Sequence, residues 1–157
     1  MKKSNRMTVC ALLLAMSTII LTACGMIEVR GKTFVYESVE IDWGMAEEDD
    51  KQALYDEYLV SNETELLNVL KTRNNRNQRV TTFGTDSTYT TVNLDNEVLD
   101  SGYYKQDEDM ITLAETEDGF ADDGNYTLKV NDKGYQVSDV LNSELSIFAV
   151  YQYVVKD

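Results

Sequence analysis

The 157-residue chain contains no histidine, no proline and only two cysteines. Histidine is the residue used most often as a general base and as a metal ligand. Its absence excludes Ser-His and Cys-His catalytic pairs and histidine-based metal sites. Both cysteines, Cys10 and Cys24, lie near the N-terminus, so the rest of the chain has no disulfide and no free thiol. Because proline is absent, every residue of a strand carries a backbone N–H for pairing.

Basic residues are scarce: 14 lysines and arginines accompany 28 aspartates and glutamates, which gives a formal net charge of −14. Nucleic-acid binding needs a basic surface, so we expect no nucleic-acid partner. Most of the carboxylates are expected to form a solvated surface. A pair of facing carboxylates, as in a hydrolase of envelope glycans, is the one enzymatic alternative, and the sequence singles out no such pair. We therefore expect a non-enzymatic protein without catalytic residues or a cofactor.

Residues 1–23 have the layout of a secretory signal peptide. The segment opens with Lys2, Lys3 and Arg6, continues with an apolar run over residues 8–22 and ends on small residues. This apolar run is shorter than the roughly 20 residues that a membrane-spanning helix needs. Removal of the segment is therefore favoured over a retained transmembrane helix.

The end of that segment, Leu21-Thr22-Ala23-Cys24, resembles the lipobox of bacterial lipoproteins. The resemblance implies cleavage before Cys24 and lipidation of its thiol, with fatty acyl chains such as palmitate holding the protein in a membrane. It also implies a location on the extracytoplasmic side of a membrane of the bacterial cell envelope. Residues 24–30 would then be a short lipidated tether, and residues 31–157 would be the folded domain.

The first strand is expected over residues 32–43. Phe34 and Tyr36 share one face of this strand, whereas Val39, Ile41 and Trp43 share the other. A strand can turn both sets inward only if an extra residue is inserted between them, so the pattern predicts a β-bulge near residues 37–38. The alternative is that both faces of the strand are partly covered.

A helical insertion is expected over residues 45–72, where Ala, Glu, Leu, Asp and Lys dominate. Asn62 and Glu65 have the spacing of a helix start, which predicts two short helices or one helix with a break near residues 60–62. The apolar stripe of this insertion needs a surface to cover, either by plugging one end of the domain or by packing on its outer wall. The stripe consists of Leu54, Tyr58, Leu66 and Leu70.

The segment 71–79 contains four basic residues and no acidic residue, which makes it the one positive island in an acidic chain. An exposed connection between helix and strand is the simpler interpretation. The functional interpretation is that these residues form an anion site or a docking patch. Its candidate residues are Lys71, Arg73, Arg76 and Arg79.

Strand and turn residues dominate from residue 80 onward. They predict further strands over residues 80–83, 88–94, 98–105, 110–114, 125–130, 135–139 and 147–156. In the turn 131–134 we expect Gly134 to have a positive φ. Closing about eight antiparallel strands into an up-and-down barrel leaves no free sheet edge. The predicted fold class is therefore mainly β, an eight-stranded antiparallel barrel with a helical insertion after the first strand.

The hairpin over residues 102–113 resembles the central hairpin of small bacterial lipocalin-like lipoproteins. In these, a Gly-x-Tyr strand turns through acidic or Asn residues into an Ile-Thr-Leu strand. Residues 31–34 and the Tyr-rich residues 151–153 fit the same layout, although the tryptophan comes later than in true lipocalins, at Trp43. The resemblance implies a lipocalin-like barrel over residues 31–157. The interior of such a barrel either holds one small ligand or is filled by side chains.

Aromatic residues are the candidates for the lining of a ligand cavity. In a barrel this small, core packing is their commoner use. The alternative is a pocket with a polar rim, lined by Phe34, Tyr36, Trp43, Tyr103, Tyr126 and Tyr151.

The acidic turns at residues 107–109 and 118–125 are the remaining candidates for a metal site, because carboxylate oxygens bind calcium. Their spacing does not match a calcium-binding loop, and acidic residues are ordinary in turns. We therefore expect no metal site.

These patterns predict a protein that acts by binding. The leading expectation is a small apolar or amphipathic ligand held inside the barrel. The alternative is a cell-envelope protein-interaction module whose barrel is filled and whose loops bind an envelope protein. A cavity of a few hundred Å³ lined by aromatic residues would favour the first, and a filled barrel with an exposed apolar or basic patch would favour the second.

Overall fold

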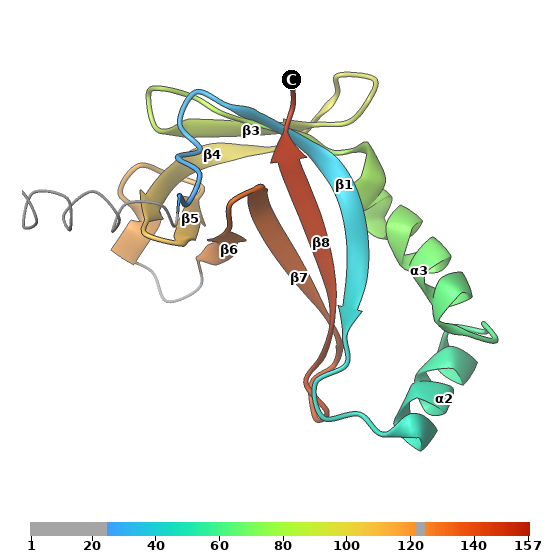
Figure 1. Cartoon of the computed structure of the whole chain (residues 1–157). Helices are drawn as coiled ribbons and strands as arrows, with labels where there is room; N and C mark the ends of the chain where they lie inside the picture. The colour runs from blue at the N-terminus through green and yellow to red at the C-terminus, as the bar shows by residue number, and fades with distance from the viewer. Residues whose placement is uncertain (1–24, 122–124) are drawn as a thin grey trace, which may run out of the picture.

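The computed structural model describes residues 25–121 and 125–157. The expected signal peptide and Cys24 lie outside the described residues. The described chain forms a closed barrel in which the strands β1 to β8 follow one another in sequence order (Figure 1). All pairings are antiparallel. The expected fold class, including the helical insertion after the first strand, is confirmed.

The element bounds follow the sequence pattern closely. The strands are β1 (Thr33–Asp42), β2 (Val80–Phe83), β3 (Thr88–Val92), β4 (Val98–Asp107), β5 (Met110–Ala114), β6 (Tyr126–Val130), β7 (Gly134–Asn142) and β8 (Ile147–Val155). The helices are α2 (Glu48–Glu57), α3 (Glu63–Thr72) and the short 3-10 segments η1 (Arg73–Gln78) and η2 (Gly119–Ala121). None of the helices that the structure describes is long and apolar enough to cross a membrane.

The predicted bulge in β1 is confirmed. The register between β1 and β8 shifts between Tyr36 and Ser38, so Glu37 is the extra residue. On either side of this shift, Tyr36 lies opposite Tyr153, and Val39 lies opposite Tyr151. Residues opposite one another in a ladder share a face, so the bulge turns both apolar sets of β1 toward the interior.

The predicted break in the helical insertion is also confirmed. Asn62 caps α3 because its Oδ1 accepts a hydrogen bond from the backbone N–H of Glu65 at 3.0 Å, and the Glu65 carboxylate accepts one from the backbone N–H of Ser61 at 2.7 Å. Helix α2 ends in a turn where the N–H groups of Leu59 and Val60 bond back to the helix. This turn places Leu59 at φ +56°, a position usually given to glycine.

The helices cover the inner face of the long strands β1, β7 and β8, which extend beyond the rest of the barrel (Figure 1). Leu66 and Leu70 of α3 are fully buried, and the Tyr151 hydroxyl of β8 donates a hydrogen bond to the Leu70 carbonyl at 3.2 Å. The insertion therefore packs on the inner face of the long strands, and η1 lies at the end of the barrel from which these strands extend. On α2 the buried aromatic residue is Tyr55, whereas Tyr58 is only half-buried, which corrects one member of the expected stripe.

Gly134 does not have the positive φ that the sequence analysis assigned to it; among the described glycines only Gly31 and Gly44 do. The turn is instead held by Asn131, whose Oδ1 accepts hydrogen bonds from the backbone N–H groups of Lys133 and Gly134 at 3.0 and 2.9 Å. Glycine is needed here for a different reason. A Cβ at position 134 would lie 2.0 Å from the carbonyl oxygen of Tyr153 on the neighbouring strand.

Aromatic rings fill one half of the barrel. Phe83 lies at their centre, in edge contact with Phe34, Tyr104 and Tyr135 at centroid distances of 5.7, 4.9 and 5.8 Å. Tyr135 stacks on Tyr153 at 4.9 Å. The filled interior that the sequence analysis left as an alternative is therefore present in this half.

The N-terminal segment 27–31 is bound to the barrel. Val29 is fully buried, and its N–H donates to the Gln106 side chain at 3.0 Å, which in turn donates to the Ile27 carbonyl at 2.9 Å. The Gly31 N–H donates to the Phe83 carbonyl at 2.8 Å. All described elements lie within residues 25–157, so a chain beginning at Gly25 contains the complete barrel.

Candidate functional site

The strongest candidate site lies at one end of the barrel, where β5 ends and β6 begins, and we call this end the mouth. A chamber of about 50 Å³ lies inside the barrel here, next to η1. Basic, acidic, hydroxyl and apolar side chains surround it: Arg76, Arg79, Thr81, Thr91, Asp100, Leu113, Tyr126, Leu128, Tyr135, Val137 and Tyr153.

A larger and more open space, which we call the outer cavity, adjoins the chamber and has a volume of about 480 Å³. The two spaces share three lining residues, Asp100, Leu113 and Tyr126. The other lining residues of the outer cavity are Tyr89, Ala114, Glu115, Thr116, Gly119 and Asn125. A small chamber with a mainly apolar surface and two arginines in its lining therefore opens into a wider space of mixed character.

The strand pairing explains why the barrel is open here. Strand β6 pairs with β7 through only two residue pairs, at Lys129 and Val130. Tyr126 pairs with Leu113 on β5 and has no partner on β7. Its side chain therefore stands at the edge of the mouth, and the residue is 47% exposed.

Arg76 of η1 is held in place on three sides. It forms an ion pair with Asp139 of β7, in which the two side chains are only 12% and 18% exposed, and its guanidinium lies over the Tyr151 ring at 5.4 Å. Its carbonyl accepts a hydrogen bond from the Tyr153 hydroxyl at 3.0 Å. Burial alone would lower the pKa of Arg76, but the hydrogen bond and charge of Asp139 raise it above its ordinary value.

Arg79 lies at the chamber without a comparable partner. Its Nη2 donates to the Asn74 carbonyl at 3.1 Å, but its buried Nε has no hydrogen-bond partner. Within residues 25–121 and 125–157, the only other buried side-chain polar atom without a partner is Asn77 Oδ1. No described carboxylate forms an ion pair with Arg79, since the two ion pairs in that part of the chain involve Lys51 and Arg76.

The Tyr135 and Tyr153 hydroxyls in the chamber stay neutral near pH 7. Burial raises the pKa of Tyr153 to about 12, although Arg76 and Arg79 lower it in part. Burial likewise raises the pKa of Tyr135 against the opposing effects of Thr81 and the two arginines. The Thr81 and Thr91 hydroxyls are hydrogen-bonded to each other at 2.9 Å. The neutral Tyr135 hydroxyl can therefore donate a hydrogen bond as well as accept one, whereas the Tyr153 hydroxyl already donates to the Arg76 carbonyl.

The outer cavity has an acidic side. Asp100 accepts a hydrogen bond from the Tyr89 hydroxyl at 3.0 Å, and Glu115 lines the same space. The pKa of Tyr89 is raised well above its ordinary value, first by burial. The hydrogen bond to Asp100 and the charges of Asp100 and Glu115 raise it further. Both carboxylates therefore lie near Tyr89.

Of the six aromatic residues expected to line a cavity, only Tyr126 does so. Phe34 is in the aromatic core, Tyr36 packs edge-on against Tyr153 at 6.2 Å, and Tyr151 is fully buried under α3 and Arg76. Tyr103 alternates with the inward-facing Tyr104 and so lies on the outer face of β4.

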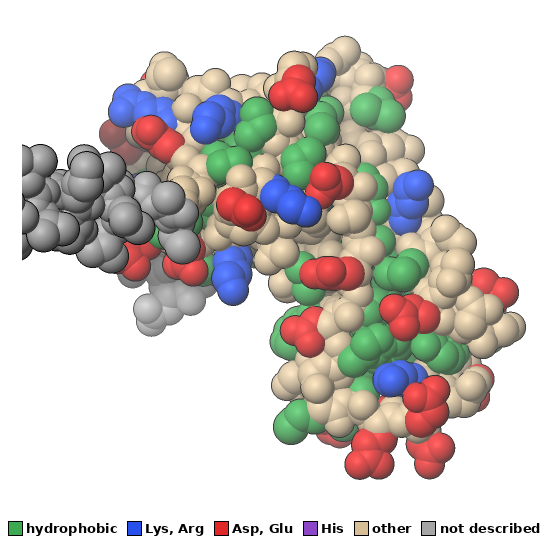
Figure 2. Space-filling view, in the orientation of Figure 1, with side chains coloured by type: hydrophobic (Ala, Val, Ile, Leu, Met, Phe, Trp, Pro, Cys, Tyr) green, Lys and Arg blue, Asp and Glu red, His purple; other side chains and the backbone are tan. Residues whose placement is uncertain are grey.

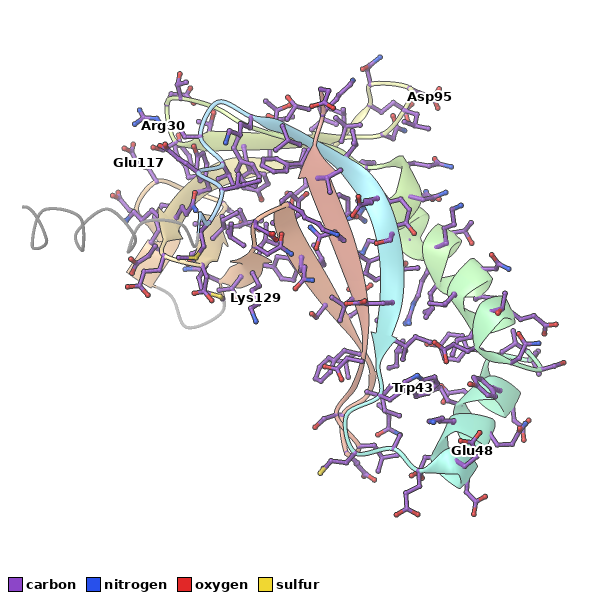
Figure 3. The ribbon with its side chains drawn as sticks, viewed as in Figure 1. Arg30, Trp43, Glu48, Asp95, Glu117 and Lys129 are labelled. Carbon is purple, nitrogen blue, oxygen red and sulfur yellow. The ribbon has the colours of Figure 1, made fainter. Side chains whose placement is uncertain are left out.

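Trp43 is also absent from the cavity, because it lies beyond the end of β1. There it meets Tyr55 of α2 at 5.9 Å, with the Lys51 ammonium over its ring at 5.6 Å. Figure 3 shows Trp43 between the strand end and this helix. Its role is to attach the helical insertion to the barrel.

The basic segment does not form one patch. Lys71 is exposed, Arg73 donates to the Tyr58 hydroxyl at 2.7 Å, and only Arg76 and Arg79 reach the chamber. Asn74 and Asn75 have φ values of +52° and +54°, which bend the segment between the two pairs. Asparagine tolerates this left-handed conformation better than most residues, so the Asn-Asn pair was the sequence signal for the bend.

The two acidic turns were the candidates for a metal site. Among the described residues, no three acidic side chains lie close enough together to hold a metal ion. Part of the second turn, residues 122–124, lies outside that part.

Comparisons with protein families, with curated proteins and with solved structures found no match to this chain. The resemblance to lipocalin-like lipoproteins therefore rests on the sequence motifs together with the observed eight-stranded barrel.

Proposed function

We propose that this chain is a lipid-anchored, extracytoplasmic, lipocalin-like binding protein that holds a small amphipathic molecule at the mouth of its barrel. The observation that carries the proposal is the meeting of the chamber and the outer cavity at Asp100, Leu113 and Tyr126. A ligand placed there would span a small, mainly apolar chamber with Arg76 and Arg79 in its lining and a wider space of mixed character. The site differs from the expected central cavity, because aromatic side chains occupy the middle of the barrel.

The two volumes suit different parts of one ligand. The outer cavity, at about 480 Å³, lies within the range of roughly 300–1,000 Å³ common for small-molecule sites. The chamber, at about 50 Å³, has room for about one or two water molecules or a single functional group. The body of the ligand therefore fits the outer cavity, and a single small group fits the chamber.

Binding without catalysis is the simpler use of these residues. Asp100 and Glu115 are two carboxylates in one groove, which is the feature that a carboxylate hydrolase would need. Asp100, however, is already the acceptor for the Tyr89 hydroxyl. This observation favours a binding site over a hydrolase.

Fluorescence titration with the neutral dye N-phenyl-1-naphthylamine tests the binding site, using residues 25–157. We expect the dye to bind, and Leu113→Gln to weaken its binding about five- to tenfold, since part of the apolar contact of Leu113 is lost. Leu94→Gln is the matched control, because Leu94 is 67% exposed in the turn between β3 and β4 and lines neither space. Equal affinities of the Leu113 variant and the wild type would contradict the proposed site.

The lipid anchor is a separate prediction, motivated by Leu21-Thr22-Ala23-Cys24. Intact-mass measurement of the protein extracted from membranes should show a chain beginning at Cys24 with a lipid adduct, and Cys24→Ala should leave an uncut or soluble product. Two or more acyl chains anchor a protein far more firmly than one. An unmodified Cys24 in the membrane fraction would refute the anchor and leave the binding site untouched.

A protein-interaction module remains the second candidate, and one observation favours it. Leu94, Val98 and Leu99 are exposed in and beside the turn between β3 and β4. Exposed apolar residues near one another can contribute to a protein contact. Absence of dye binding in the titration would make this candidate the stronger one.

A further inference from the structure

We propose that the chamber receives an acidic group of the ligand, a carboxylate, sulfonate or phosphate, and that Arg79 is the residue that recognises it. This inference rests on the proposed function and adds to it the charge of the ligand and the direction in which it lies. The acidic end would point into the barrel, and the apolar body would lie in the outer cavity.

The contrast between Arg76 and Arg79 is the first observation. Both come from the same short segment, and both line the chamber. Arg76 has its carboxylate partner in Asp139, whereas Arg79 has none among the described residues and leaves a buried Nε unpaired. A buried guanidinium donor without a partner is costly and therefore rare in folded proteins.

The acidic composition of the chain makes the absence of a described carboxylate partner for Arg79 unusual. With 28 acidic residues against 14 basic ones, a carboxylate partner for an arginine is easily supplied. Acidic side chains are numerous on the lobe around α2 in Figure 2. An arginine left unpaired inside the barrel of such a chain is explained if its partner arrives with the ligand.

The other groups of the chamber support an anion. The Tyr135 and Tyr153 hydroxyls are neutral near pH 7, and the charges of Arg76 and Arg79 act on both rings. The Tyr153 hydroxyl already donates to the Arg76 carbonyl, so the Tyr135 hydroxyl and the guanidinium of Arg79 are the donors left for an anion. Hydrogen bonds to an ionised acceptor are about twice as strong as neutral ones.

The remaining charges at the mouth fix the direction of the ligand. The charge of Arg76 is balanced by Asp139. Asp100 stands where the chamber meets the outer cavity and is engaged by Tyr89, and Glu115 lies further out. In the outer cavity an acidic group would lie beside both carboxylates, whereas in the chamber it would lie beside Arg79 and only one carboxylate, Asp100. The chamber is therefore the more favourable place for it.

A pair of dyes with the same aromatic body tests the assignment. Anilinonaphthalene sulfonate carries one sulfonate, and N-phenyl-1-naphthylamine carries none. Using residues 25–157, we expect the sulfonate dye to bind about tenfold more tightly, the effect of one charge-assisted hydrogen bond. Arg79→Gln should abolish this preference while keeping affinity for the neutral dye, and Arg79→Lys should retain part of it. Arg73→Gln is the control, because it removes a charge from the same segment outside the chamber.

Each outcome decides between the two proposals. Equal binding of both dyes to the wild type, or an unchanged preference in Arg79→Gln, overturns the role of Arg79 and leaves the proposed binding site standing. Absence of binding by either dye overturns the binding site and the anion assignment together. If the Arg79→Gln variant binds neither dye, the Arg79→Lys variant is the deciding measurement. A preference for the sulfonate dye in that variant supports the assignment, and the loss of this preference overturns it.

Discussion

Replacing Phe83 by alanine should lower the free energy of unfolding by about 3–5 kcal/mol, the usual cost of removing a large aromatic side chain from a core. Phe83 is fully buried and makes edge contacts with Phe34, Tyr104 and Tyr135. Its removal would leave a void that the surrounding rings, held in closed strands, can fill only in part. Denaturant melts of residues 25–157 followed by circular dichroism measure the effect.

Leu94→Ala is the control for this melt, because Leu94 is largely exposed and should change the stability by no more than about 0.5 kcal/mol. A Phe83 variant as stable as the Leu94 variant would mean that the aromatic cluster is not the stabilising centre of the barrel.

Replacing Leu66 by alanine should cost about 2–5 kcal/mol if α3 packs on the inner face of the long strands as described. Leu66 has no exposed surface, and the next turn of α3 brings Leu70 to the Tyr151 hydroxyl. Val69→Ala on the same helix is the matched control, because Val69 is 40% exposed. The same denaturant melts compare the two variants.

Equal stabilities of the Leu66 variant and the wild type would show that the helices are a solvated appendage. The position of η1 over the chamber would then be in doubt as well, since η1 continues directly from α3.

The sequence predicted the barrel because its signals are local. Alternating strands, turn residues and the capping residues Asn62 and Glu65 each act over a few positions, and all agree with the same fold. Even the bulge at Glu37 could be predicted, since a change of phase in β1 has few other physical solutions.

The site could not be predicted with the same success because it depends on contacts between distant residues. Residue type marked Arg79 as one of four basic candidates, but only the fold separates it from Arg73, which bonds to Tyr58. Asp100 and Leu113 carried no signal beyond strand alternation. Aromatic residues were assigned to a cavity by type, whereas β1 and β8 use most of theirs in the core.

The bound N-terminal segment has a consequence for how the protein would stand on a membrane. Segment 27–31 is fastened to the barrel end that carries the turns between β2 and β3, β4 and β5, and β6 and β7, through Phe83, Gln106 and Asn131. The mouth lies at the opposite ends of these strands. A lipid on Cys24 would therefore hold this end of the barrel close to the membrane through a short linker. The mouth, at the opposite end, would open toward the aqueous side. The ligand would then enter from the aqueous phase, and the bilayer would serve only to anchor the protein.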